Sequence, residues 1–519
     1  MCRRLIISPY DHANLRAWGP HGVREACAFG FVKVGFLSKY LKKVARPRGV
    51  EPLTPRSVVW CSIQLSYGRV PSSIPAVQAA TTTPAGCGKA RRIIGRALAG
   101  GSWQDHIGRM SPDTTAAGQL ASDDPTSRPS VVLLPGRHRR AEGGHPWIFS
   151  NEVQMGAEVK ALAPGVLVTL RRADDSALGV AMFNPHTLLA ARLLDRDTGR
   201  AIGRRFFARR LERALRLREQ LFDAPYYRLV HAEADGLPGL VVDRFGAILV
   251  VQSNTAGMSR LEPLVLDALS ELLEPEAIVL RNDSPARALE GLASETGVAR
   301  GRIEGPVRVH ENGAVFHADL LAGQKTGWFF DQRDNRRFIA SLARGARILD
   351  LYCFTGGFAV QAARAGADGV LGIDRSETAL TLGAEAAELN AVGETCSFRR
   401  GEAFGEAARL AAAGERFDVV IADPPAFAKS RKDVPAALRG YRKLARLAAA
   451  LTANRGILFL ASCSFSVGEA EFAEAVRRGL GDAGRDGRIL RVAGAGADHP
   501  IHPALPETAY LKTLTLALD

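Results

Sequence analysis

Residues 131–203 alternate short apolar runs with turn residues. Three runs have the length of β-strands, at 131–134, 166–171 and 178–183, and turns rich in Pro, Gly or Asp separate them. Short strands at such close spacing are typical of a small β-barrel or β-roll. We therefore predict a small β domain over residues 131–203.

The hydrophobic period then becomes helical. Residues 204–222 form a basic amphipathic pattern in which Leu211, Leu215 and Phe222 share one face. We interpret this helix, over 204–223, either as a solvated linker or as a clamp on RNA. A small α+β domain should follow over 224–318. Its expected parts are a strand at 247–253, a helix at 261–273, a strand at 277–281 and a hairpin at 307–316.

Residues 319–519 alternate apolar strands with alanine-rich helical segments. Strands are expected at 346–351, 369–373, 418–422 and 456–461. This alternation is typical of an α/β fold, in which helices cover a parallel sheet. Two final strands, at 488–492 and 511–518, have only a loop between them. A loop favours an antiparallel hairpin at the edge of the sheet.

Composition places the chain among globular proteins, because 46% of its 519 residues are hydrophobic and 24% are charged. The net charge of +14 suggests a polyanionic partner. The charge is uneven, however. Residues 1–130 contain 18 Lys or Arg and 7 Asp or Glu, whereas residues 131–519 contain 50 and 47. Most of the positive charge therefore belongs to the first quarter of the chain.

That first quarter shows no sustained hydrophobic period and is rich in Arg, Gly, Ser, Thr and Pro. We expect residues 1–130 to be a disordered or spuriously translated extension, with the natural start near Met110. The competing interpretation is a basic, disordered arm that binds RNA. N-terminal sequencing of the native protein separates the two.

The cysteine pattern argues against metal clusters and disulfides. The seven cysteines are odd in number and none is spaced as CxxC, so we expect no zinc site, iron–sulfur cluster or disulfide framework. The sequence has no run of 18 apolar residues and no secretory signal, which makes the cytoplasm the expected location. The cysteines are Cys2, Cys27, Cys61, Cys87, Cys353, Cys396 and Cys463.

A strand followed by a glycine turn and a helix, over residues 348–365, is the first motif that carries chemistry. Its glycines allow a ligand to approach the backbone, and the helix start offers free N–H groups. The turn does not match GxGxxG, which makes a dehydrogenase less suitable. Asp374 ends the next strand, where a carboxylate can accept both hydrogen bonds of a ribose diol. The nucleotide-binding candidates are therefore Asp374 and the glycine turn that follows Asp350.

Glu402 follows the next expected strand, 396–400. Its carboxylate could contact the amino group of an adenine. The alternative interpretation is an exposed loop residue.

The segment Asp423-Pro424-Pro425-Ala426-Phe427 follows four apolar residues, 419–422. A buried strand should deliver Asp423 to the carboxyl edge of the sheet, where open α/β sheets bind their ligands. The two prolines stiffen the turn, and Phe427 could stack on a base. The alternative is a plain turn at a strand end.

Ser462-Cys463-Ser464 ends the following strand. A lone cysteine is usually a small buried hydrophobe. One strand away from Asp423, however, Cys463 is a candidate nucleophile. A thiolate added to carbon 6 of a pyrimidine makes carbon 5 able to attack an electrophilic methyl group, and Asp423 could stabilise the charge on the ring.

With these motifs in place, residues 131–519 resemble the class I S-adenosylmethionine-dependent 23S rRNA cytosine-5 methyltransferases that carry an N-terminal PUA domain. The matching segments begin at Gly144 (GHPWIFS), His231 (HAEADGLPGL), Lys325 (KTGWFFDQRDNR), Thr355 (TGGF), Asp423 (DPPAF), Ser462 (SCS) and Ala497 (ADHP). The resemblance implies a Rossmann-like methyltransferase sheet with an antiparallel last strand, preceded by an RNA-binding PUA-like domain.

The same resemblance implies roles for individual residues. S-adenosylmethionine (SAM) would contact Asp331, Gln332, Arg333, the 354–356 turn, Asp374 and Asp423, and Cys463 would attack a cytosine of large-subunit rRNA. Two positions depart from the family pattern: Glu402, where relatives often carry Asp, and the Ser464-Phe465-Ser466 segment. The base that removes the carbon-5 proton is not evident; His499 and water are both candidates.

A basic RNA-binding surface must be formed by local clusters of Lys and Arg, because residues 131–519 carry a net charge of only +3. The predicted RNA-binding residues are Arg137, Arg139, Arg140, Trp147, Phe427, Lys429, Arg431 and Lys432. The expected partner is large-subunit rRNA, with no membrane and no metal, and the sequence leaves a homodimer open.

Three alternatives remain open at this point. Asp-Pro-Pro-Ala-Phe is close to the turn of base amino-group methyltransferases, which need no thiol. Uracil-5 methylation uses a thiol, but the clustered cysteines of the cluster-bearing uracil enzymes are missing. A non-catalytic RNA-binding assembly factor would need neither Asp374 nor Cys463, and a failure to bind SAM in calorimetry would favour it.

We expect a variant that starts at Met110 to bind rRNA nearly as tightly as the full chain, with an affinity that falls steeply as salt is raised. The measurement is a titration of labelled rRNA at several salt concentrations. A large loss of affinity on truncation would instead favour the basic-arm hypothesis.

Overall fold

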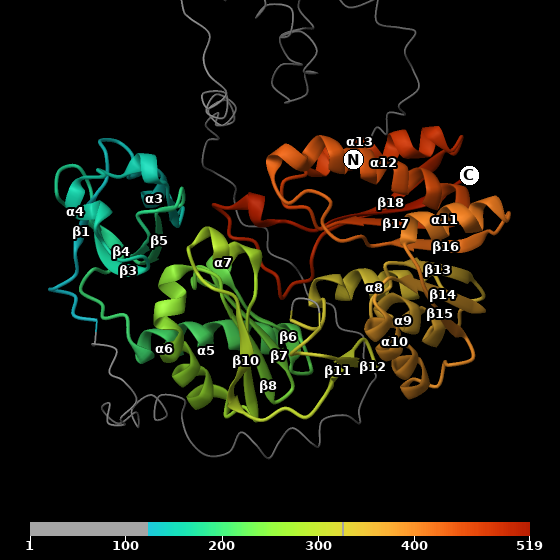
Figure 1. The fold of residues 1–519 in the computed structure, drawn as a ribbon, viewed down its shortest axis with the longest axis horizontal. Coiled ribbons are helices and arrows are strands. Elements are labelled where there is room, and N and C mark those ends of the chain that lie inside the picture. The colour runs from blue at the N-terminus through green and yellow to red at the C-terminus, as the bar shows by residue number, and fades with distance from the viewer. Residues whose placement is uncertain (1–122, 324–325) are drawn as a thin grey trace, which may run out of the picture. The chain divides into compact units, whose positions relative to one another are not determined.

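The computed structural model describes residues 123–323 and 326–519 (Figure 1). The two expectations for the N-terminal quarter, a start near Met110 and a basic RNA-binding arm, lie outside the described residues.

A five-stranded sheet is built by residues 130–195, with the strand order β1-β3-β4-β5-β2. Its core contains Val131, Val168, Leu170 and Phe183, all essentially without solvent exposure. The elements are β1 (Ser130–Val132), α3 (Arg139–Glu142), β2 (Trp147–Ile148), α4 (Ala157–Lys160), β3 (Val166–Arg171), β4 (Ala177–Phe183) and β5 (Ala191–Asp195). The predicted small β fold is therefore present, with short helices at its edge.

The second sheet, β10-β9-β8-β7-β6, is antiparallel except for the pair β8 and β9. Its elements are α5 (Arg204–Leu221), β6 (Tyr226–His231), β7 (Leu240–Phe245), β8 (Ile248–Ser253), α6 (Ala256–Leu273), β9 (Ala277–Asn282), α7 (Pro285–Leu289) and β10 (Glu295–Gly301). Helix α6 starts five residues before the predicted helix, because the Thr255 side chain accepts a hydrogen bond from the Met258 N–H and caps it.

Helix α5 shares a core with this second sheet. Phe207, Leu211 and Leu215 are buried with Val242 and Val265 in one hydrophobic cluster. The helix expected as a solvated linker thus has one face packed into a domain core. Its apolar face is wider than the sequence stripe suggested, because two adjacent phenylalanines at its start also turn inward.

Strands β11 (Val307–Glu311) and β12 (Ala314–Ala318) form the predicted hairpin. Asn312 and Gly313, the two turn residues, both have positive φ, which gives the mirror-image turn that suits the twist of a two-residue hairpin loop.

The C-terminal sheet has seven strands in the order β15-β14-β13-β16-β17-β19-β18. Strand β13 pairs with both β14 and β16, so the strand order reverses beside it. Strand β19 is antiparallel to both neighbours, β17 and β18. The strands are β13 (Arg347–Leu351), β14 (Gly369–Asp374), β15 (Cys396–Arg400), β16 (Phe417–Ala422), β17 (Thr452–Ser462), β18 (Gly487–Ala493) and β19 (Lys512–Leu518).

Helices cover both faces of the seven-stranded sheet (Figure 1). Helices α11 (Ala403–Ala412), α12 (Val434–Leu451) and α13 (Glu469–Asp482) contribute to one core, and α8 (Arg333–Ala340) and α9 (Gly357–Arg364) to the other. Helix α10 (Glu377–Leu389) packs on β12 and β15. The predicted Rossmann-like α/β class and the antiparallel C-terminal hairpin are confirmed. Such sheets bind ligands at the carboxyl ends of their strands, near the reversal of strand order.

Candidate active site

The glycine turn after β13 is held by the carboxylate at the end of β14. Asp374 accepts hydrogen bonds from the backbone N–H of Phe354 (3.1 Å) and of Ser376 (2.9 Å). Gly356 has a φ of +74°, and a Cβ at this position would meet the Phe398 ring at 3.0 Å. Glycine is therefore required by both conformation and space. Each Asp374 oxygen keeps a second lone-pair direction for a ligand hydroxyl.

Two buried polar groups beside this turn fit a bound nucleoside. Within the described chain, no close hydrogen bond reaches the Thr355 hydroxyl or either carboxylate oxygen of Asp350, although both residues are buried and the Ala359 N–H lies near Asp350. Burial and then the nearby Asp423 carboxylate raise the pKa of Asp350 well above its usual value. Buried polar atoms almost always have partners in native proteins, so these atoms indicate a polar ligand. Phe354 is half-buried, with its ring edge-on to Phe329.

Asp331 and Gln332 lie in a short 3-10 turn, Phe330–Gln332, just before α8. Both are buried. The Tyr510 hydroxyl donates to Asp331 at 2.5 Å, and the Asn335 side-chain amide donates to Gln332 at 2.7 Å. These bonds fix the two side chains beside the C-terminal loop. Their contacts with SAM remain predictions.

The Arg333 side chain forms contacts with other parts of the protein. Its guanidinium donates to the backbone carbonyl of Tyr226, stacks 4.5 Å from the centre of the Phe222 ring and approaches Glu311 at 3.9 Å. Arg333 thus contacts Phe222, Tyr226 and Glu311, which lie earlier in the chain and which no sequence motif links to it. Its contact with SAM stays a prediction.

Asp423 and Cys463 follow the neighbouring parallel strands β16 and β17, at the same edge of the sheet. The Cys463 thiol donates to the backbone carbonyl of Pro424, with sulfur and oxygen 3.7 Å apart. The structure therefore brings together the two loops that carry the predicted catalytic residues. Both side chains are half-buried, which leaves each partly accessible.

The two serines that flank Cys463 are bonded inside the protein. Tyr441, on α12, accepts a hydrogen bond from the Ser462 hydroxyl (2.9 Å), and its own hydroxyl lies 2.8 Å from that of Ser464. Ser464 also accepts from the Ala428 N–H at 3.1 Å. This network ties the cysteine loop to the Asp423 loop. No motif signals Tyr441 in the sequence, because its role depends on packing of the helix.

Phe427 packs against this network. Its ring centre lies 4.7 Å from that of Tyr441 and 6.0 Å from that of Phe404. It is half-buried, so only part of the ring is available for the predicted stacking on a base.

Glu402 caps helix α11. Its carboxylate accepts hydrogen bonds from the backbone N–H groups of Phe404 (3.1 Å) and Gly405 (2.7 Å), and the residue is exposed. An N-cap acceptor stabilises a helix start, which accounts for an acid here. The adenine contact remains a prediction.

In the first sheet, two of the predicted RNA-binding residues have partners within the protein. Arg140 donates to the Glu152 carboxylate at 2.8 Å and to the Trp147 carbonyl at 3.1 Å, and it stacks on the Phe149 ring. The Trp147 indole N–H donates to Glu233 at 2.8 Å. These contacts give both residues structural roles that the sequence did not indicate.

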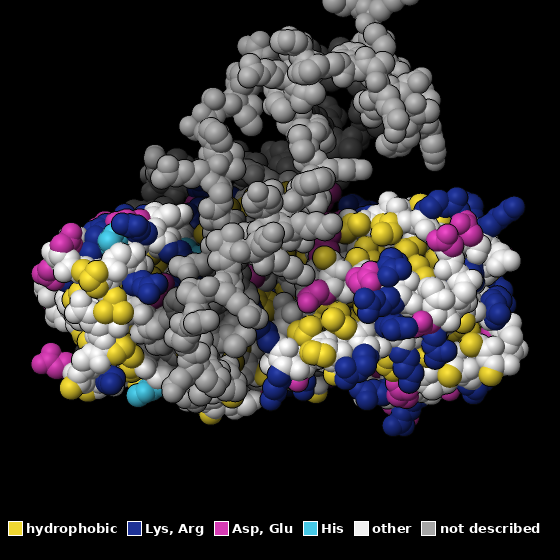
Figure 2. Space-filling view, turned by 90° about the horizontal axis from the view of Figure 1, so that it is seen from above, with side chains coloured by type: hydrophobic (Ala, Val, Ile, Leu, Met, Phe, Trp, Pro, Cys, Tyr) yellow, Lys and Arg dark blue, Asp and Glu magenta, His cyan; other side chains and the backbone are white. Residues whose placement is uncertain are grey.

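The other predicted basic residues lie at the surface. Arg137 and Arg139 are exposed before and within α3, and Lys429, Arg431 and Lys432 are exposed in the loop after β16. Figure 2 shows Lys and Arg side chains gathered on the face that carries α12 and α13. This distribution is compatible with RNA binding, which remains a prediction for each residue.

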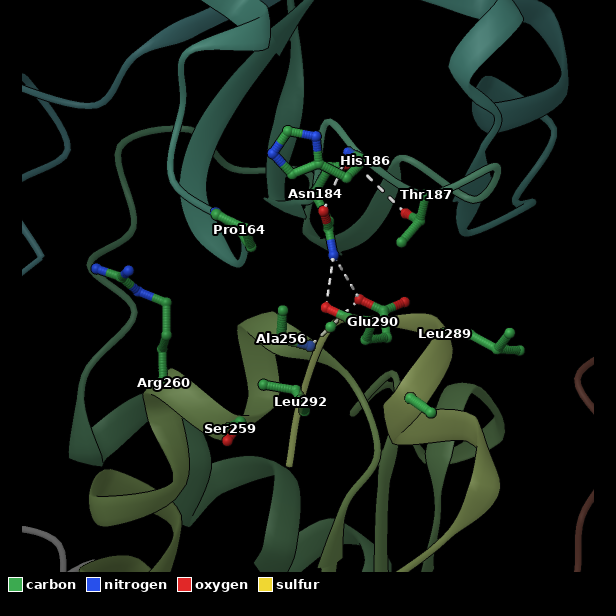
Figure 3. A pocket seen from close by; sticks show the side chains of 12 residues that line it. Pro164, Asn184, His186, Thr187, Ala256, Ser259, Arg260, Leu289, Glu290 and Leu292 are labelled. Atoms are coloured by element: carbon green, nitrogen blue, oxygen red, sulfur yellow. Dashed lines mark hydrogen bonds between the residues drawn. The ribbon is translucent and has the colours of Figure 1, made fainter. Parts of the chain in front are cut away.

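A cavity of about 420 Å³ lies away from the strand ends described above (Figure 3). It is bounded by the 184–187 loop, the start of α6 and the end of α7. Asn184 and Glu290 face each other in it, and the Asn184 amide donates to the Glu290 carboxylate at 3.0 Å. None of the predicted site residues lines this cavity.

Across residues 123–323 and 326–519, no group of three or more His, Cys, Asp or Glu side chains is arranged to hold a metal ion. In the same residues, no helix is long and apolar enough to cross a membrane.

Two family models match the chain: a PUA-like domain over residues 131–196 and an S-adenosylmethionine-dependent methyltransferase over residues 292–482. "Ribosomal RNA large subunit methyltransferase I" of Aeromonas hydrophila is 36% identical over 395 residues, which cover 75% of this chain and 98% of that protein. The protein of the same name from Shewanella denitrificans is 34% identical over 389 residues, covering 74% and 98%.

Solved structures show the same fold. A SAM-dependent methyltransferase from Streptococcus mutans superposes with a TM-score of 0.64 at 18% identity, covering 75% of this chain and all of that one. The crystal structure of SMU.776, a methyltransferase complexed with SAH, gives a TM-score of 0.65 at 18% identity with the same coverage.

Proposed function

Because the chain belongs to the ribosomal RNA large subunit methyltransferase I family and is SAM-dependent, we propose that it forms 5-methylcytosine in large-subunit rRNA through a covalent adduct with Cys463. The observation that supports this proposal is that the Asp423 and Cys463 loops are in contact at the carboxyl edge of the sheet, where the Cys463 thiol donates to the Pro424 carbonyl. A base amino-group methyltransferase would need the Asp423 loop but no thiol beside it.

The chemistry follows from the two side chains. The thiolate of Cys463 adds to carbon 6 of cytosine, and the electrons of the carbon 5–carbon 6 double bond become available at carbon 5. SAM, when bound, supplies an electrophilic methyl group to that carbon. Loss of the carbon-5 proton then restores the double bond as the carbon–sulfur bond breaks and the thiolate leaves. Asp423, as the protonated acid, would donate a hydrogen bond to ring N3 and so stabilise the negative charge that develops on the ring during addition.

The group that takes the carbon-5 proton is open between His499 and water. His499 is buried, with its Nδ1 2.9 Å from the Asp498 carboxylate and its ring 5.0 Å from that of His231. The Asp498 carboxylate fixes the orientation of the His499 ring.

The residues that would hold SAM are Asp350, Thr355 and Asp374, together with the glycine turn. Asp374→Asn should weaken SAM binding by about 10–100-fold, because the neutral amide loses charge-assisted bonds to the ribose hydroxyls. Isothermal titration calorimetry measures the effect. The matched control is Glu377→Gln, an exposed acid in the first turn of α10, which should bind SAM as the wild type does. Equal affinity in both variants would contradict this role of Asp374.

Mass mapping of methylated nucleotides in rRNA from a deletion strain tests the proposal as a whole. We expect one 5-methylcytosine to disappear from the large-subunit rRNA and to return on expression of the full chain. Loss of an amino-methylated base, or of methyluracil, would overturn the cytosine-5 assignment.

A further inference from the structure

Lys512, the first residue of β19, is a lysine inside the protein. Its side chain is only 7% exposed, and its ammonium donates to the backbone carbonyls of Ser464 and Tyr510, at 2.7 Å each. A buried charge is unfavourable unless it is paired with an opposite charge. Carbonyl oxygens satisfy donors but leave the charge uncompensated.

Among the residues that the structure describes, the positive charge of this ammonium is not balanced by a neighbouring carboxylate. In the described part of the chain, no acid forms an ion pair with Lys512, and an ammonium has three donors of which the two carbonyls use two. Burial lowers the pKa of Lys512, whereas Cys463 and, less strongly, the exposed Glu469 at the start of α13 raise it. Cys463 is therefore the strongest anionic influence on this lysine.

The sheet places the ammonium beside the cysteine loop. Lys512 is the antiparallel partner of Ser462, which directly precedes Cys463, and it bonds the carbonyl of the residue that directly follows the cysteine. Lys512 therefore holds the loop just after Cys463, at Ser464, whereas the Tyr441–Ser462 bond holds it just before the cysteine.

Other groups face Cys463 from the surrounding elements. Tyr441 of α12 and Tyr510, just before β19, are buried, and burial raises the pKa of both phenols, so they stay neutral near pH 7. The Asp423 carboxylate follows the neighbouring strand and would disfavour a second anion. Lys512 supplies a positive charge against that effect.

We infer that Lys512 is a positioning residue that stabilises the thiolate form of Cys463 and fixes the loop carrying it. The inference deepens the proposed function, since it assigns the group that activates the proposed nucleophile. A neighbouring cation favours the reactive thiolate over the thiol.

The test is the pH dependence of iodoacetamide alkylation at Cys463 in the full chain, followed by mass spectrometry of the peptide that contains it. Lys512→Met and Lys512→Gln should each react about tenfold more slowly near pH 7, which corresponds to a shift of one pKa unit, and should approach the wild-type rate at high pH. Lys512→Arg, which keeps the charge, should follow the wild-type profile. Lys160→Met removes an exposed lysine from α4 and serves as the control for a general loss of charge.

Three outcomes would overturn the inference. The first is an unchanged pH profile of Cys463 alkylation in Lys512→Gln, which keeps a donor for the loop carbonyls. The second is a shift of that profile in Lys512→Arg as large as in the neutral variants. The third is an alkylation rate in the neutral variants that is lowered equally at all pH values. The last would show a displaced loop without an electrostatic effect.

Methylation by Cys463→Ala, measured in parallel, separates this inference from the proposed function. Methylation retained in that variant would overturn the covalent route while a shifted alkylation profile still supported Lys512. Methylation lost, together with an unshifted profile in the Lys512 variants, would overturn only the role of Lys512.

Discussion

Cys463→Ala should lose rRNA methylation by at least about 10³-fold while it still binds SAM. In the proposed mechanism the thiol forms the bond to carbon 6 that makes carbon 5 reactive, so its removal should stop the reaction. Its sulfur contacts the Pro424 carbonyl, whereas the glycine turn is held by Asp374, so the turn and Asp374 should be undisturbed. The measurement is transfer of labelled methyl from SAM to rRNA, with calorimetry of SAM binding alongside.

The matched control is Cys396→Ala. Cys396 is also half-buried and begins β15 in the same sheet, but it lies at the opposite strand end from the proposed chemistry. We expect its methylation rate to stay within a few-fold of the wild type. Retained methylation in Cys463→Ala would contradict the covalent route and favour attack by an amino group of the base.

Arg218→Met should destabilise the protein by about 3–5 kcal/mol, the effect of removing one partner from a buried ion pair. Arg218 has no solvent exposure, and two of its nitrogens bond the Asp235 carboxylate at 2.6 and 2.8 Å. It also donates to the backbone carbonyls of Arg228 (2.9 Å) and Asp498 (3.0 Å). The substitution leaves Asp235 buried without its partner and both carbonyls without a donor. Urea denaturation followed by circular dichroism measures the loss.

Arg216→Met, two residues earlier in α5, is the control. Arg216 is 60% exposed and pairs with Glu212 one helical turn away, an arrangement that contributes only about 0.3–0.5 kcal/mol. Equal destabilisation by the two variants would contradict the special role of the buried pair.

The parts of the fold that could be predicted from sequence are those specified by local pattern. Strands β13, β14 and β16 are short apolar runs, and each was expected within one residue of its observed bounds. The antiparallel pair β18 and β19 followed from the absence of a helix between them. The start of α6 was missed because its first turn lacks an apolar period and depends on the Thr255 cap.

The residues of the candidate site also fall into those that local pattern predicts and those that depend on distant contacts. Asp374, Asp423 and Cys463 each follow a recognisable strand, so their common edge follows from parallel topology. Tyr441 and Lys512 were missed, because their importance comes from contacts made across the fold with the loop after β17. Arg140 and Trp147 bond Glu152 and Glu233, partners that charge and aromaticity alone do not reveal. RNA binding by these two residues stays a prediction.

The bonds of Asp374 to the N–H groups of Phe354 and Ser376 shape the glycine turn with groups of the chain alone. The conformational entropy of that loop is therefore lost during folding, so ordering the loop does not weaken ligand binding. A turn formed in advance should let a nucleoside bind without a slow closing phase. The slow step would then lie with the RNA, whose target base has to leave its stack before it can reach the proposed nucleophile.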